Sequence, residues 1–216
     1  MFSHHSAELG EVRLHYVTAG SGARALVLLH GWPQSWWEWR RIMPALAEHF
    51  TVIAPDMRGL GDSSCPPGGY DKATVANDIW RLMSEVLGYQ NFYLVGHDWG
   101  GPVAYALAHA HMEAVEKLAI LDVVVPFGSA DDLTWGGKRW HHGFHWVQDL
   151  PEALVSGRER MYLSWFYNNL AYNPAAISPE DIDEYARAYS RPGVLRAGFE
   201  YYRATTTDIA DNNENK

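Results

Sequence analysis

The sequence contains a single cysteine, which limits both its redox chemistry and the compartment it suits. Cys65 has no second thiol in the chain with which to form a disulfide, as is typical of proteins from a reducing compartment. The sequence pattern places no partner histidine for it, so a nucleophilic role for the thiol is disfavoured. We therefore expect a cytoplasmic protein whose reactive group is another side chain.

Long apolar runs and an excess of basic charge are also missing. No apolar run approaches the roughly 20 residues of a membrane helix, and Met1–Glu8 lacks the basic start and apolar stretch of a signal peptide. The 26 acidic and 17 basic side chains give a formal net charge of -9. This balance disfavours nucleic acid and membranes as partners and fits an enzyme for small neutral or cationic ligands. Homo-oligomer formation is left open.

Short apolar runs alternate with helical patterns in the first part of the chain. Val12–Thr18 alternates apolar and polar residues, as a half-buried strand does. A fully apolar run occurs at Ala25–Leu29, and similar buried runs recur at Thr51–Ala54, Phe92–Val95 and Leu118–Leu121. Helical patterns lie between them, near Trp37–His49, Thr74–Leu87 and Gly101–His109. This order predicts an α/β fold with a mostly parallel sheet and helices on both faces.

Beyond Pro126 the strand pattern stops and tryptophan, tyrosine and histidine become frequent. Ser178 precedes a proline and two acids, which predicts a capped helix start, and a second helix is expected after Gly193. We interpret residues 1–126 as a core, residues 127–207 as an inserted helical cap, and residues 208–216 as the start of a further core segment. The last residues, Asp211–Lys216, are expected to form a solvated tail.

An aspartate stands where a strand turns into a helix. Asp98 lies in the stretch Gly96–Gly100, written GHDWG, directly after an apolar run. Glycines on both sides permit the strained turn of a nucleophile elbow, and the positive end of the following helix favours an ionised carboxylate. The alternative is an aspartate that only caps this helix. A nucleophilic carboxylate suits displacement at saturated carbon, which predicts an alkyl-enzyme ester formed from an epoxide or an alkyl halide.

Two further motifs carry a resemblance to a known family. His30–Arg40, written HGWPQSWWEWR, matches the pattern HGxPxxWxxWR, and Asp56–Ser63 is similar to DxRGxGxS. With the aspartate elbow, these motifs resemble the α/β-hydrolase-fold epoxide hydrolases over about Leu14 to Tyr202. The resemblance implies an α/β-hydrolase core with a helical cap. It also implies opening of a small hydrophobic epoxide to a vicinal diol, with no metal or organic cofactor.

The resemblance also implies roles for particular residues. The backbone N–H groups of Trp32 and Trp99 would form the oxyanion hole that the tetrahedral step of ester hydrolysis needs. Asp122, which ends an apolar run, would orient the catalytic base; its alternative role is a loop cap. Tyr202, within Phe199–Arg203, and His141 would donate hydrogen bonds to the epoxide oxygen. Core packing of the tyrosine and ordinary packing of the histidine are the alternatives.

No residue of this sequence matches the catalytic base of the family. That base is a histidine after the last strand of the sheet, whereas all eleven histidines of this sequence lie at or before His145. We expect either that the chain is truncated, with truncation favoured, or that a partner completes the fold. His141 and His145 are four residues apart, as metal ligands on one helix face can be, but no third ligand accompanies them.

Other functions remain as alternatives. A haloalkane or haloacid dehalogenase uses the same aspartate, acting on an organohalide. Trp32 stands where many haloalkane enzymes have asparagine, and Trp99 where fluoroacetate enzymes usually have arginine, so epoxides are favoured. A truncated, non-catalytic chain that binds hydrophobic ligands is the alternative outside enzyme function.

Overall fold

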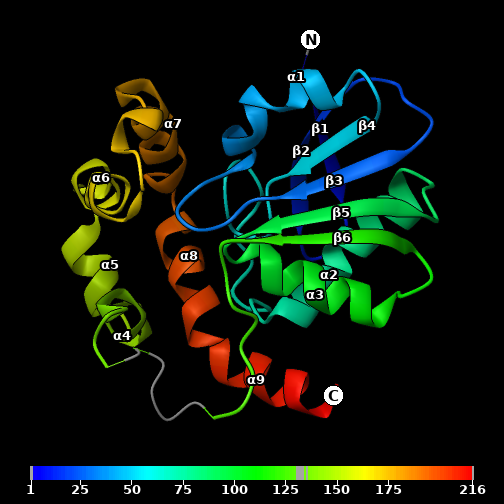
Figure 1. Ribbon diagram of the computed structural model, residues 1–216. Helices are drawn as coiled ribbons and strands as arrows, with labels where there is room; N and C mark the ends of the chain where they lie inside the picture. Colours follow the sequence, from blue (N-terminus) through cyan, green and yellow to red (C-terminus); the bar gives the residue numbers. More distant parts are fainter. Residues whose placement is uncertain (1, 130–133, 135, 216) are drawn as a thin grey trace.

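The computed structural model describes residues 2–129, 134 and 136–215. Its strands form one six-stranded sheet flanked by helices (Figure 1). The strands are β1 (Ser3–Glu8), β2 (Arg13–Ala19), β3 (Ala25–Leu29), β4 (Thr51–Pro55), β5 (Phe92–His97) and β6 (Val115–Leu121), in the spatial order β1-β2-β4-β3-β5-β6. The strands β4, β3, β5 and β6 run parallel, while β1 and β2 pair antiparallel. The predicted α/β class and mostly parallel sheet are confirmed.

Strand β1 was not predicted from the sequence. Its residues are polar and exposed except Ala7, so the apolar alternation that marks the other strands is missing. Pairing with β2 holds it in place, from Ser3 opposite Thr18 to Glu8 opposite Arg13. The ring of His4 also packs edge-on against Trp36, with ring centroids 5.2 Å apart. An edge strand needs only one such neighbour, which explains its weak sequence pattern.

The core helices differ from the predicted ones in their detail. The single helix expected near Trp37–His49 is two short elements, the 3-10 helix η1 (Trp36–Arg41) and α1 (Met43–Leu46), with a proline in the first turn of α1. The second prediction corresponds to α2 (Lys72–Arg81), which continues as the π-helical turn η2 (Leu82–Val86). The third is α3 (Gly100–Ala110), beside α2. Separate apolar clusters cover the two faces of the sheet.

Helices from the second half of the chain lie together at the carboxyl ends of the strands (Figure 1). They are α4 (Trp140–Trp146), α5 (Leu150–Val155), α6 (Glu159–Leu170), the 3-10 helix η3 (Pro174–Ala176), α7 (Pro179–Tyr189) and α8 (Val194–Arg203). The predicted start of α7 is confirmed, because Ser178 and Asp181 form a reciprocal capping box. Helix α8 lies between α4–α6 and the sheet in Figure 1. None of the described helices is long and apolar enough to cross a membrane.

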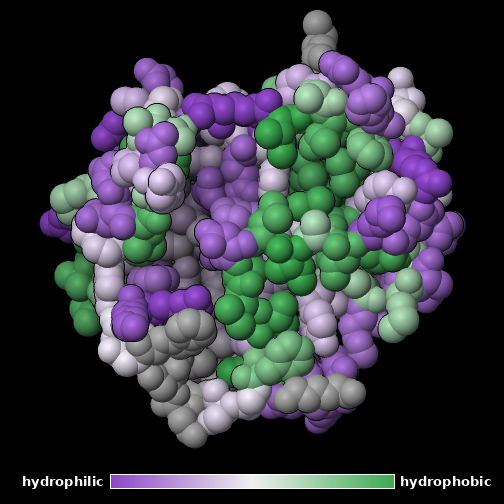
Figure 2. Space-filling model, viewed as in Figure 1, coloured by the Kyte–Doolittle hydropathy of each residue, from purple (hydrophilic) through white to green (hydrophobic). Residues whose placement is uncertain are grey.

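Strand β6 forms the edge of the sheet opposite β1, and the side chains of β6 are largely exposed. Leu118 and Leu121 are 41% and 42% exposed, and Val124 and Phe127 in the following segment are also exposed. Figure 2 shows apolar side chains gathered over this part of the molecule, beside the more hydrophilic helices of the second half. Such an edge presents unpaired backbone groups next to apolar side chains.

The expected solvated tail after Asp211 is instead part of a helix. Helix α9 (Thr205–Glu214) continues to Glu214, and its side chains Asp208 and Asn212 are buried. Asn212 donates a hydrogen bond to the backbone oxygen of Pro126. The polar composition of this segment concealed the fact that several of its polar groups have specific buried partners.

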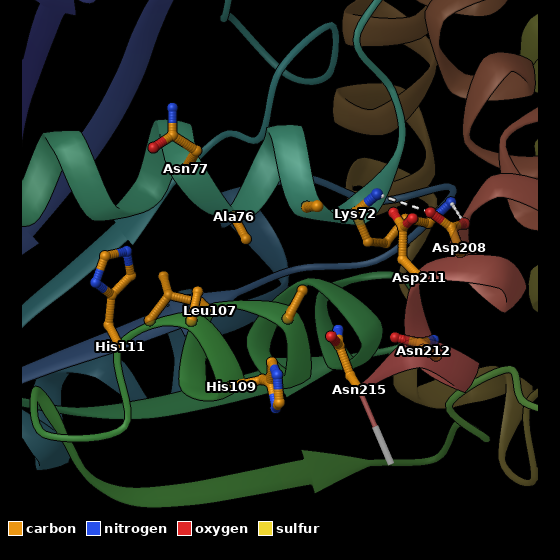
Figure 3. Close-up of a pocket in the computed structure, with 13 residues that line it drawn as sticks. Lys72, Ala76, Asn77, Leu107, His109, His111, Asp208, Asp211, Asn212 and Asn215 are labelled. Carbon is orange, nitrogen blue, oxygen red and sulfur yellow. Dashed lines mark hydrogen bonds and ion pairs between the residues drawn. The ribbon is translucent and has the colours of Figure 1, made fainter.

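One of those partners is a buried lysine at the start of α2. Lys72 Nζ lies 2.7 Å from Asp208 Oδ2, and both side chains are almost fully buried. The backbone N–H of Lys72 donates to Asp208 Oδ1, and its Nζ to the backbone oxygen of Tyr201. Figure 3 shows this pair at one end of a cavity of about 270 Å³ between α2, α3 and α9. The ion pair therefore fastens α9 to the core.

Asp208→Ala is expected to lower the free energy of unfolding by about 3–5 kcal/mol, because it leaves the Lys72 charge buried without its partner. Equilibrium unfolding in urea measures this loss. Asp183→Ala is the matched control, since it breaks an exposed ion pair with Arg160 and should cost about 1 kcal/mol or less. Similar losses in the two variants would contradict the assignment.

Candidate active site

Asp98 lies at the turn between β5 and α3. Its φ of 47° is in the left-handed region, and Gly101 N–H donates to its backbone oxygen at 2.8 Å. A Cβ at Gly96 would lie 2.1 Å from the Gly100 oxygen, so the turn closes only because no side chain is present there. The N-cap residue of α3 is Trp99, with no capping side-chain hydrogen bond. The geometry is that of a nucleophile elbow rather than a helix cap.

Backbone amides hold the Asp98 carboxylate. Trp32 N–H donates to Oδ1 at 2.9 Å, and the backbone N–H of Trp99 is the second donor. The structure thus brings together the aspartate predicted as the nucleophile and the two amides predicted as an oxyanion hole. Burial raises the pKa of Asp98, while the charge of His97 and these two hydrogen bonds act against that rise.

The approach of Trp32 to Asp98 depends on the glycine between His30 and Trp32. A Cβ at Gly31 would lie 2.3 Å from Asp98 Cβ and 2.7 Å from its Oδ1. We expect Gly31→Ala to displace the carboxylate and to slow its alkylation by an epoxide about 100-fold, measured by intact-mass spectrometry. Gly68→Ala is the control, because no atom lies within 4 Å of the added Cβ. An unchanged rate in Gly31→Ala would contradict the tight contact.

Asp122 follows β6 and lies beside Asp98 in the sheet. His97 pairs with Leu121, and Asp98 N–H donates to the Leu121 oxygen at 3.2 Å. Asp122 also has a positive φ, 51°, so strained backbone occurs at two neighbouring strand ends, as is common in active sites. No histidine among the described residues hydrogen-bonds to Asp98 or Asp122. The orienting role of Asp122 stays a prediction.

Two cavities, each of about 310 Å³, meet at Asp98. Both are lined by Asp98, Asp122, His141, Leu170 and Tyr202. The first continues along the segment 123–127 to Ile209, and the second along Pro33 and Gln34 to Phe166, Tyr167 and Ile177. The walls are mainly apolar and aromatic, which suits an apolar ligand with polar groups only near the carboxylates.

Tyr202 and His141 come from different helices and both line these cavities. Tyr202, on α8, is 3% exposed, and its ring centroid lies 5.0 Å from Trp99 and 5.9 Å from His141 on α4. Burial raises the pKa of Tyr202 well above its ordinary value, so its hydroxyl stays protonated. Burial and the charge of Arg139 lower the pKa of His141 to about 4. His141 is therefore a neutral hydrogen-bond donor at neutral pH.

Two groups of side chains have the residue types of metal ligands: the pair His141 and His145, and the cluster His15, Asp56 and Asp62. His145 is fully buried, and its Nε2 lies 2.6 Å from the Tyr162 hydroxyl. His15, Asp56 and Asp62 bring ligand atoms within 4.8 Å of one another. Asp56 already accepts hydrogen bonds from His15 and from backbone N–H groups, and Asp62 forms an ion pair with Arg187. These contacts give the second group a structural role in bracing the loop after β4.

Glu38 and His97 form an ion pair that the sequence did not suggest. His97 Nδ1 lies 3.3 Å from Glu38 Oε2. The histidine lines the second cavity together with Asp98. Two features of the sequence could have indicated this pair: the histidine directly before Asp98, and an acid at a variable position of the His30–Arg40 motif.

Comparisons with known proteins agree with this geometry. A family model described as the alpha/beta hydrolase fold matches residues 24–172. A soluble epoxide hydrolase of Corynebacterium sp. (strain C12) is 47% identical over 219 residues, which cover 99% of this chain and 75% of that protein. A fluoroacetate dehalogenase of Burkholderia sp. is 32% identical, covering 95% and 70%. The solved structure of epoxide hydrolase CorEH without ligand is 45% identical, covers 98% and 76%, and has a TM-score of 0.91. The chain therefore belongs to the epoxide hydrolase family of α/β-hydrolase-fold proteins.

Proposed function

We propose that this protein opens epoxides to vicinal diols through a covalent ester on Asp98. The observation that carries the proposal is the position of the Asp98 carboxylate. It lies under two backbone N–H donors and at the meeting point of two apolar cavities that Tyr202 and His141 also line. A nucleophile, an oxyanion site and donors for the leaving oxygen are the groups that this reaction requires.

In the first step, the carboxylate oxygen of Asp98 that is not held by Trp32 attacks an epoxide carbon. The carbon–oxygen bond of the ring breaks, and the electron pair stays on the leaving oxygen. Tyr202 transfers its hydroxyl proton to that oxygen, and the neutral His141 donates a second hydrogen bond. The product is a 2-hydroxyalkyl ester of Asp98. Without a donor the ring would have to open to a free alkoxide, which is far less stable.

In the second step, water adds to the Asp98 carbonyl carbon of this ester. The negative charge of the tetrahedral intermediate develops on Oδ1, which the Trp32 amide already contacts at 2.9 Å. The donors are therefore in place before the charge forms, which is the condition for strong oxyanion stabilisation. Collapse of the intermediate releases the diol and restores the carboxylate, while a proton from the water restores the Tyr202 hydroxyl.

An organohalide is the second candidate substrate, and one contact disfavours it. Halide departure requires N–H donors that face the leaving group. The Trp32 side chain lines the second cavity but packs against α8, since a Cβ at Gly198 would be 3.0 Å from Trp32 Nε1. This leaves the Trp99 indole, beside the first cavity, to supply such a donor. A tyrosine hydroxyl that can give up a proton serves an epoxide oxygen but not a halide. We therefore favour the epoxide.

Mass spectrometry of the alkylated protein tests this proposal. The chain is incubated with styrene oxide or 2-phenylethyl bromide, quenched in acid and digested. We expect rapid addition of the whole epoxide mass to the peptide that contains Asp98, or release of the diol, and slower labelling by the bromide. Labelling at another residue, or neither adduct nor diol, would refute epoxide opening. Faster labelling by the bromide would favour the dehalogenase.

A further inference from the structure

A buried ion pair next to the nucleophile has no part in the steps above. Glu38 lies on η1, and its side chain is 7% exposed. One carboxylate oxygen faces His97 Nδ1 at 3.3 Å, while the other, Oε1, is buried without a hydrogen-bond partner among the described residues. Burying a carboxylate with so few partners is costly. The pair therefore needs an explanation beyond the contact between η1 and the end of β5.

The two edges of the His97 ring face different surroundings. Nδ1 is directed to Glu38, and the side chain is 29% exposed where it lines the cavity that contains Asp98. Within the described part of the chain, Nε2 has no hydrogen-bond partner. The Nδ1 edge of the imidazole thus contacts a buried acid, and the opposite edge faces the space that the substrate would occupy.

We propose that Glu38 and His97 are positioning residues for the nucleophile: Glu38 keeps His97 positively charged, and that charge keeps the buried Asp98 carboxylate ionised. This inference rests on the proposed nucleophilic role of Asp98. A carboxylate must be deprotonated to attack an epoxide carbon. Burial alone would favour its neutral form, and a nearby opposite charge favours the ionised one.

The pKa directions agree with this geometry. Burial raises the pKa of Asp98, and the charge of His97 is the largest effect that opposes the rise. Burial would lower the pKa of His97, but the hydrogen bond and charge of Glu38 raise it to about 9. Burial also raises the pKa of Glu38, opposed by His97. The other charged groups that act on these three are His30, Lys72, Asp122 and Arg139. Four buried titratable side chains also face Glu38 or Asp98: Tyr167, Tyr185, Tyr189 and Tyr202.

The test is the pH dependence of Asp98 alkylation in the 216-residue chain. Single-turnover labelling by styrene oxide is followed by intact mass from about pH 5 to about pH 10 in wild type, Glu38→Gln and His97→Asn. We expect the acidic limb of the profile to move up by about one pH unit or more in both variants. Labelling on that limb then falls about tenfold or more, while the alkaline plateau is kept. Glu116→Gln, which breaks an exposed pair with Arg24, should keep the wild-type profile.

The outcomes separate this inference from the proposed function. Absence of Asp98 labelling in wild type at every pH refutes the nucleophile itself. Wild-type labelling with unchanged acidic limbs in both variants overturns the role of the pair, as does an equal loss of rate at every pH. Histidine NMR titration of the wild type gives a check that needs no variant. His97 should titrate near 9, as its raised pKa indicates, and titration below its ordinary value would overturn the inference.

Discussion

Asp98→Asn should reduce labelling by styrene oxide by at least about 10⁴-fold, the scale seen when a catalytic nucleophile is removed. An amide oxygen is a far weaker nucleophile than a carboxylate, so no ester forms. The side chain keeps its shape, and the Trp32 amide at 2.9 Å still finds an oxygen acceptor at Oδ1. The loss is therefore expected without a matching loss of stability, which thermal unfolding checks beside the mass spectra.

Two further variants serve as controls for this result. Asp98→Ala excludes slow conversion of asparagine back to aspartate. Asp122→Asn is the matched control, because Asp122 lines the same cavities but its proposed role concerns only the hydrolysis of the ester. Its labelling rate should stay within about tenfold of wild type. Wild-type labelling of Asp98→Ala, or an equal loss in Asp122→Asn, would remove Asp98 from its proposed role.

The core of the fold could be predicted because buried parallel strands have a distinct sequence pattern. Each of the four predicted apolar runs lies in a strand of the sheet, three of them buried or partly buried and one in the largely exposed β6, and the capped start at Ser178 begins α7. The apolar sequence pattern did not predict elements that are exposed or that are held by pairs of polar side chains. Strand β1 is exposed on most of its residues. Helix α9 buries polar groups against partners distant in the chain, such as Asp208 against Lys72.

The same division applies to the site. Asp98, Trp32 and Trp99 lie in motifs that resemble those of a known family, so their meeting could be expected although Trp32 and Asp98 are 66 positions apart. The pairing of Glu38 with His97 joins residues 59 positions apart and depends on where η1 packs against the end of β5. No spacing rule reports such a contact. Even for His141, whose position was predicted, the neutral state follows only from its burial beside Arg139.

Tyr202→Phe is expected to slow epoxide labelling of Asp98 about 10²–10⁴-fold, the usual contribution of a positioned proton donor. The variant keeps the ring, which packs 5.0 Å from Trp99 and 5.5 Å from Trp32 between centroids, and removes only the hydroxyl. His141→Leu should have a smaller effect, because a neutral imidazole contributes a hydrogen bond and keeps its proton. Intact-mass kinetics at neutral pH measure both.

Comparing two electrophiles separates proton donation by Tyr202 from packing. Bromide leaves without a proton, so labelling by 2-phenylethyl bromide should be nearly unchanged in Tyr202→Phe while labelling by styrene oxide falls. Equal slowing with both reagents would instead mean that the hydroxyl only positions the cavity walls. Tyr201→Phe is the control within the same helix, since that hydroxyl donates to the backbone oxygen of Arg58. It should leave the ratio of the two labelling rates at its wild-type value, even if the lost hydrogen bond costs about 1 kcal/mol of stability.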